Sequence, residues 1–95
     1  MNILIPEPAW FSCEPDETHF FAWLSEIGAV RSVTASREGL ELVVDTPVDK
    51  ASFYELVGLL TRYDLDRTSV RPLCIDHPDD WFRDRKNYWY QSVFG

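Results

Sequence analysis

Two cysteines and two histidines are the side chains in this 95-residue chain best suited to catalysis or metal binding: Cys13, His19, Cys74 and His77. Thiolates and imidazoles bind zinc, and a cysteine beside a histidine can act as an activated nucleophile. Cys74 and His77 have C-x2-H spacing, but no matching pair accompanies them and no glycine-rich elbow supports a nucleophile. The pattern favours a solvated His19 and two buried thiols, which the fold derived below would place on neighbouring strands.

Three carboxylates, Asp76, Asp79 and Asp80, crowd the approach to the C-terminal segment. A calcium loop of the EF-hand type has a fixed ligand spacing and a glycine, and both are missing here. The cluster therefore indicates helix capping and a solvated turn. Since no phosphate-binding glycine loop occurs either, we expect no cofactor and a chain that is not an enzyme.

The net charge of −7 is unevenly distributed. Residues 1–66 carry twelve acidic and four basic side chains, whereas residues 67–95 carry four acidic and five basic ones. An acidic body disfavours nucleic acid and anionic membranes, both of which need clustered Lys and Arg. The charge is compatible with a basic protein partner, and it also serves solubility alone.

The chain begins MNILIPEPAWF, without the basic start and long apolar run of a signal peptide. No stretch approaches the roughly 20 apolar residues of a membrane span. Two cysteines without a signal indicate reduced thiols, so the sequence predicts a cytoplasmic protein of bacterial type.

Two amphipathic helices are predicted. In the first, Pro15 suits an opening position, Phe20, Trp23, Leu24 and Ile27 form one stripe, and Gly28 provides a left-handed stop. The second begins at the N-cap Asp49 and ends in residues 63–66, with a stripe that comprises Phe53, Leu56, Val57 and Leu60. Between them, residues 29–46 alternate as a β-hairpin with its turn at residues 37–39.

The outer strands are less distinct. The first strand is either residues 3–5 or residues 9–13, and we favour 9–13, because Pro6 and Pro8 bar a continuous ladder through both. Residues 69–75 form the last strand, where Pro72 requires an edge position. This order predicts an α+β fold of the ferredoxin-like βαββαβ type, a two-layer sandwich with sheet order 4-1-3-2.

The chain forms a single domain, residues 1–95, with a βαββαβ core in 1–78 and an aromatic extension in 79–95. The extension, DDWFRDRKNYWYQSVFG, holds six of the fourteen aromatic residues. Phe82, Trp89 and Val93 fall on one helical stripe, so a helix could cover the open face or an edge of the sheet. The alternative is an aromatic patch for a partner, because Tyr and Trp dominate interface hot spots.

Three segments, FFAWLSEIGAVRSV, ELVGLLTRYDLDRTSV and above all WFRDRKNYWYQSVFG, resemble short uncharacterised bacterial proteins with an aromatic W-F…YW…VFG ending. Some of those proteins are associated with toxin–immunity gene clusters. The resemblance implies a stoichiometric binding protein, such as an immunity protein that neutralises a toxin domain encoded nearby. It implies no catalytic residues.

The sequence therefore predicts a non-catalytic protein-binding module. The alternatives are a small regulatory or ligand-binding domain that dimerises through its sheet and, third, a small enzyme. The expected partner-binding residues combine acidic rim positions with tail tyrosines: Glu38, Glu41, Asp45, Asp64, Asp66, Tyr88 and Tyr90.

Overall fold

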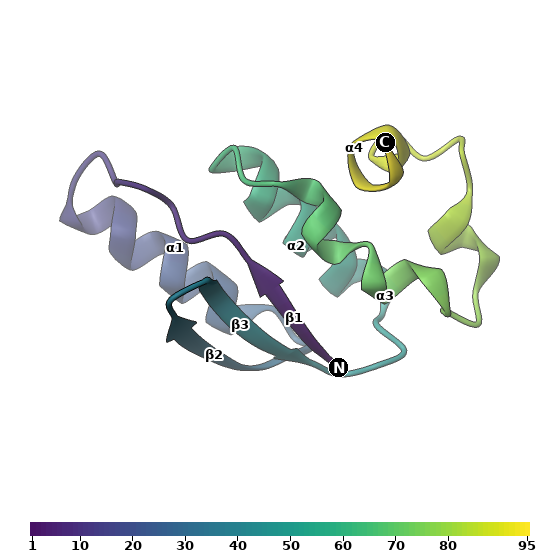
Figure 1. The fold of residues 1–95 in the computed structure, drawn as a ribbon, viewed down its shortest axis with the longest axis horizontal. Helices are drawn as coiled ribbons and strands as arrows, with labels where there is room; N and C mark the ends of the chain where they lie inside the picture. Colours follow the sequence, from purple (N-terminus) through teal and green to yellow (C-terminus); the bar gives the residue numbers. More distant parts are fainter.

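A three-stranded antiparallel sheet packs against two helices in the computed structural model, which describes residues 1–95 (Figure 1). The strands, in the spatial order β1-β3-β2, are β1 (Asn2–Ile5), β2 (Val30–Ser36) and β3 (Gly39–Val44). The long helices are α1 (Glu14–Glu26) and α2 (Lys50–Arg62). Shorter helical segments follow: η1 (Arg67–Val70), α3 (Pro72–Ile75), η2 (Asp80–Arg83) and α4 (Tyr90–Phe94). None of the helices has the length and apolar character needed to cross a membrane.

The predicted hairpin is confirmed. Alternate residues of β3, Leu40, Leu42 and Val44, are buried in the core, while Glu41 faces outward. The turn brings Ser36 opposite Gly39, whose φ of 140° is closed to most side chains. A Cβ at Gly39 would also collide with the carbonyl oxygen of Ile5 on β1, so glycine is required on two counts.

The two long helices are confirmed, with one correction. At the start of α2 the Asp49 carboxylate accepts a hydrogen bond from the Ser52 backbone N–H at 3.0 Å, and this bond lowers the pKa of Asp49. The predicted core stripe of α2 is buried. The left-handed stop at Gly28 is wrong, because α1 ends at Ile27 in an extended conformation and Gly39 is the one glycine with positive φ.

The preferred position of the first strand is also wrong. The strand is Asn2–Ile5, where Ile3 and Ile5 pair with Leu42 and Leu40 and point into the core. Residues 9–13 instead form the loop into α1. Phe11 of this loop packs on Phe20, with ring centroids 5.6 Å apart, so the loop is apolar without being a strand.

The ferredoxin-like fold is not confirmed, because the fourth strand is absent. Residues 69–75 are helical, from the end of η1 through α3, and Pro72 lies in the first turn of α3. The buried residues there, Val70, Leu73 and Cys74, have the i, i+3, i+4 spacing of a helix and not the alternation of a strand. Since η1 contacts β1, helical segments stand where the fourth strand was expected.

The C-terminal extension buries three of its side chains, but it lies elsewhere than predicted and is not one helix. Phe82 in η2, Trp89 before α4 and Val93 in α4 are each at most 1% exposed. The rings of Phe82 and Trp89 pack on Phe53 of α2, with centroids 5.3 and 4.8 Å from its own, and α4, which carries Val93, contacts η1. The extension therefore packs on α2, away from the hairpin (Figure 1), and the outer face of the sheet stays uncovered.

Candidate protein-binding surface

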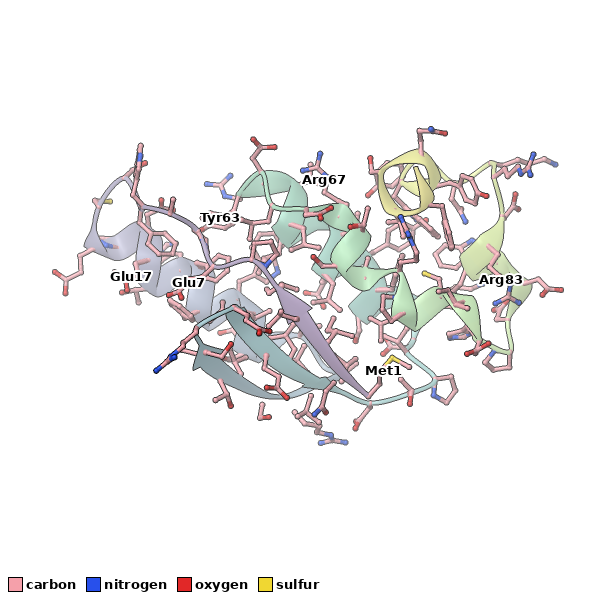
Figure 2. All side chains as sticks on the ribbon, in the orientation of Figure 1. Met1, Glu7, Glu17, Tyr63, Arg67 and Arg83 are labelled. Atoms are coloured by element: carbon pink, nitrogen blue, oxygen red, sulfur yellow. The ribbon has the colours of Figure 1, made fainter.

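Arg83 fastens η2 to the end of α3. Its guanidinium donates to the carbonyl oxygens of Cys74 and His77, both at 2.8 Å, and to the Asp80 carboxylate at 2.6 Å. Figure 2 shows Arg83 at the end of the molecule opposite Glu17 of α1. Arg83 thus joins η2 to the last turn of α3 and to the segment that follows it, and so holds the extension in place.

His77 has a structural role in the same junction. Its Nδ1 accepts a hydrogen bond from the Asp79 backbone N–H at 3.0 Å, so the ring proton is on Nε2, which donates to the Val48 carbonyl oxygen at 2.8 Å. The imidazole also stacks on Phe82 at 3.7 Å. Asp79 in turn caps η2 by accepting from the Trp81 N–H at 2.9 Å, which confirms the capping predicted for the carboxylates.

The two cysteines lie in different elements and differ in environment. Cys13 is exposed just before α1, whereas Cys74 is buried in α3. The expectations that both thiols are buried and lie on neighbouring strands are therefore wrong. Burial raises the pKa of Cys74 to about 12, so its thiol stays protonated and inert. No group of three or more His, Cys, Asp or Glu side chains is arranged to hold a metal ion.

Two exposed tyrosines stack where α2 meets the extension. The rings of Tyr54 and Tyr88 are nearly parallel, at 6° and 6.2 Å, and the residues are 41% and 73% exposed. Tyr54 also contacts Trp81 edge-on at 5.4 Å. The Lys50 ammonium lies 4.9 Å from the Trp81 ring, so this tryptophan supports both neighbours.

The same face of α2 continues from Tyr54 to the end of the helix. Tyr54, Gly58 and Arg62 follow one another at intervals of four residues, so they lie on one side over about 12 Å at 1.5 Å per residue. Gly58 has no side chain, and the Trp23 ring of α1 fills the space above it: a Cβ on Gly58 would lie 3.8 Å from that ring. We call Tyr54, Gly58 and Arg62, with Trp23 and Tyr88, the α2 face.

At its far end the α2 face opens into a groove between α1 and the end of α2. The groove consists of two hollows of about 450 and 670 Å³, which share Asp16, Arg62 and Tyr63. Trp23 and Glu26 line the first hollow. Trp10 and Asp64 line the second. We refer to these seven residues as the α1–α2 groove.

Hydrogen bonds hold the floor of the groove. The Tyr63 hydroxyl donates to Asp16 Oδ1 at 3.2 Å, and the Ser12 backbone N–H donates to Asp16 Oδ2 at 3.2 Å. Figure 2 shows Tyr63 at the end of α2, beside the segment that leads into α1. The groove therefore has a fixed geometry between the two helices.

The structure does not bring the predicted partner-binding residues together. Three of them, Glu38, Glu41 and Asp45, lie on the hairpin or at its end. There Glu41 accepts from the Asn2 amide at 3.1 Å, and Asp45 pairs with Arg31 at 2.6 Å, which lowers the pKa of Asp45.

The other predicted residues lie on the helical side of the molecule. Asp64 ends α2 and Asp66 caps η1, where a bond from Thr68 lowers the pKa of Asp66. Tyr90 stacks on Phe94 in α4 at 4.9 Å. Of the seven residues, Tyr88 belongs to the α2 face and Asp64 to the α1–α2 groove.

Sequence reasoning missed Tyr54, Trp10 and the exposed side of Trp23. One signal was available: Tyr54 is an aromatic residue outside the core stripe of a strongly amphipathic helix. Trp10 carries no comparable signal, because its segment also fits the pattern of a strand.

The chain matches no protein-family model, and neither a curated protein nor a solved structure matches it.

Proposed function

We propose that this chain is a non-catalytic protein-binding module whose partner docks on the α2 face. The observation that carries the proposal is the Tyr54–Tyr88 stack, two large rings that are 41% and 73% exposed. Tyrosine supplies wide contact area at little conformational cost and is enriched among hot spots of interfaces. Because Trp81 packs against Tyr54 from the side, the Tyr54 ring is held in place before a partner arrives.

The charge of the molecule supports a basic partner. The net charge is −7, and residues 1–66 hold twelve of the sixteen acidic side chains, although α2 itself carries only Glu55 against Lys50 and Arg62. Opposite charge on a partner speeds encounter and excludes acidic competitors. We therefore propose a basic protein domain as the ligand.

The resemblance of the C-terminal segment to proteins from toxin–immunity clusters supports a more specific proposal. The partner would be a toxin domain encoded beside this gene, and the chain would neutralise it as an immunity protein. An inhibitor of this type needs no catalytic groups; it needs a rigid, complementary surface.

Co-expression with the product of the neighbouring gene tests the proposal. We expect a one-to-one complex in size-exclusion chromatography with light scattering, and rescue of growth if the neighbour is toxic. Tyr88→Ala and Tyr54→Ala should each weaken the complex by at least about tenfold, as expected for hot-spot residues. Glu38→Gln, at the tip of the distant hairpin, is the matched surface control and should leave affinity unchanged.

A neighbour that is harmless and forms no complex would contradict the proposal. Equal affinity of the tyrosine variants and the control would contradict the docking face, while leaving a protein-binding function in place.

Exposed Leu4 favours the second candidate, a regulatory domain that dimerises through its sheet. Leu4 is 41% exposed on the outer face, beside half-buried Val43. Glu41 lies opposite Leu4 in the register, however, and Thr34 lies opposite Glu41, so the face is mainly polar. A light-scattering mass of twice 11.1 kDa that Leu4→Asn reduces to 11.1 kDa would favour this candidate over ours.

A further inference from the structure

We infer that the α1–α2 groove is a receptor for a positively charged side chain, an arginine or a lysine, presented by the protein partner. The inference rests on the proposed protein-binding function and names the chemistry that one end of the surface recognises. It stands on three features of the groove: its aromatic walls, its charge balance and its unpaired carboxylate.

Three aromatic rings line the groove. Trp10 is 74% exposed and stacks on no other ring, whereas Trp23 is half-buried and Tyr63 packs edge-on against Phe20 at 4.8 Å. The groove thus has two rings packed against the fold and one exposed ring. Flat aromatic faces attract guanidinium and ammonium groups within about 6 Å of the ring centre.

The protein already contains such a contact at this place. The Arg62 guanidinium carbon lies 6.0 Å from the centre of the Tyr63 ring. A ligand guanidinium could therefore pack on an aromatic ring of the groove in the way that Arg62 packs on Tyr63. Trp10 and Trp23 provide further faces that Arg62 does not occupy.

The charge balance of the groove favours a cation. Asp16, Glu26 and Asp64 supply three negative charges against the positive charge of Arg62, and Arg67 pairs with Asp64 at 3.5 Å, so one negative charge remains in excess. Arg62 forms no direct ion pair with any of the three carboxylates. An acidic ligand would have to overcome this excess at close range.

Glu26 is the carboxylate best placed to receive the ligand. Asp16 is already engaged with Tyr63 and Ser12, and Asp64 lies 3.5 Å from Arg67. Glu26 forms no hydrogen bond or ion pair and lines the hollow beside Trp23. A charged side chain that stacks on Trp23 can therefore pair with Glu26, and such charge-assisted bonds are the stronger ones in proteins.

The first experiment uses the full chain and three short probes, acetyl-Gly-Xaa-Gly-amide with arginine, citrulline or glutamate at the centre. Citrulline matches arginine in shape but has no charge. In two-dimensional NMR titrations we expect the arginine probe to shift the Trp10 and Trp23 indole N–H signals and to bind at least about threefold more tightly than citrulline. Equal binding of arginine and citrulline would overturn the inference, and tighter binding of glutamate would show an anion site centred on Arg62.

Matched variants locate the site. Trp10→Ala and Glu26→Gln should each weaken the arginine probe by about three- to fivefold, the loss expected for an exposed cation–π contact or ion pair. Glu41→Gln removes the same charge from the outer face of the sheet and should have no effect. If Glu41→Gln weakens binding as much as Glu26→Gln, the groove is not the site and only the overall charge attracts the probe.

The same variants separate this inference from the proposed function. A partner that binds Glu26→Gln and Trp10→Ala as tightly as the unaltered chain would overturn the inference and leave the function standing. A groove that selects arginine while no neighbouring protein forms a complex would leave the groove standing and contradict the function.

Discussion

At the scale of single residues, Arg83 is the side chain on which the junction between α3 and η2 most depends. Arg83→Gln removes the charge and cannot donate to the Cys74 and His77 carbonyls and Asp80 at once. Because hydrogen bonds from a charged group contribute about 1.5–3 kcal/mol, we expect the free energy of unfolding in urea to fall by about 2 kcal/mol. Arg85→Gln, exposed and without an ion pair, is the control and should change it by less than about 0.5 kcal/mol. Equal losses would show that Arg83 acts only through its charge.

A second residue-scale prediction concerns alkaline pH. Burial raises the pKa of Cys74 from 9.0 to about 12. The unfolded chain therefore loses the thiol proton at lower pH than the folded chain, and unfolding becomes easier as the pH rises from about 9 towards 12. Below about pH 9 the thiol is protonated in both the folded and the unfolded chain, so Cys74 adds no pH dependence to the free energy of unfolding.

Cys74→Ala isolates this contribution, because it removes the thiol and leaves the rest of the chain unchanged. We expect the free energy of unfolding of the unaltered chain to fall more steeply than that of Cys74→Ala, by up to about 1.4 kcal/mol per pH unit. If the free energies of unfolding of the two proteins fall in parallel between pH 9 and 11, the raised pKa of Cys74 is contradicted. Cys13→Ala, at an exposed position, should follow the unaltered chain.

At the scale of elements, α2 contains a glycine at its centre that lowers the stability of the helix. Gly58 lies mid-helix, and a Cβ there would meet the Trp23 ring at 3.8–3.9 Å, an ordinary contact distance. Gly58→Ala should therefore raise the free energy of unfolding by about 0.5–1 kcal/mol, because alanine restricts the unfolded chain and fits the helix. Thermal and urea denaturation measure this. Gly39→Ala should instead lower the free energy of unfolding, because φ is 140° there and the Ile5 carbonyl is close.

The C-terminal extension is a second element-scale case, since its burial makes it part of the core. Deletion of residues 81–95 would expose Phe53 and remove the buried Phe82, Trp89 and Val93. We expect the truncated chain to unfold or aggregate, as seen by circular dichroism and light scattering. A truncated chain that stays monomeric with unchanged melting would contradict this.

A milder change at Trp89 tests the same burial without removing the segment. Trp89→Ala should cost about 3–5 kcal/mol by leaving a cavity. Trp89→Phe should cost much less, because it keeps an aromatic ring beside Phe53 and removes an indole N–H that has no hydrogen-bond partner.

The elements also show which sequence patterns were sufficient to predict secondary structure. The helices and the hairpin could be predicted because their periodicity is long and their ends carry specific residues, such as Asp49. Residues 69–75 could not be, because a short apolar run that contains Pro72 suits an edge strand and the first turn of a helix equally well. The prediction of one helix in the extension was wrong for a related reason. Phe82, Trp89 and Val93 have a helical spacing by coincidence, because residues 84–89 separate η2 from α4.

At the scale of the whole molecule, the candidate site was the harder part to predict. Charge and expected exposure predict the acidic partner-binding residues, but exposure alone does not indicate which residues lie on the same surface. The α2 face combines side chains from α1, α2 and the extension, so its composition follows from the packing of three elements. The cluster of aromatic residues near the end of the sequence points to Tyr88, whereas Trp10 and Tyr54 lie outside any such cluster, each beside a phenylalanine that packs in or against the core.

Net charge and aromatic contacts should act on different steps of binding, and this is the prediction that belongs to the whole molecule. The charge of −7 acts over distances that salt screens, so the association rate with a basic partner should fall as ionic strength rises. The Tyr54–Tyr88 stack acts at contact, so Tyr88→Ala should mainly raise the dissociation rate and leave the salt dependence of association unchanged. Stopped-flow measurements from about 0.02 to 0.5 M salt separate the two effects, because the screening length falls several-fold across that range. An association rate that is independent of salt would show that the partner is not basic and that the acidic surface serves only to keep the protein in solution.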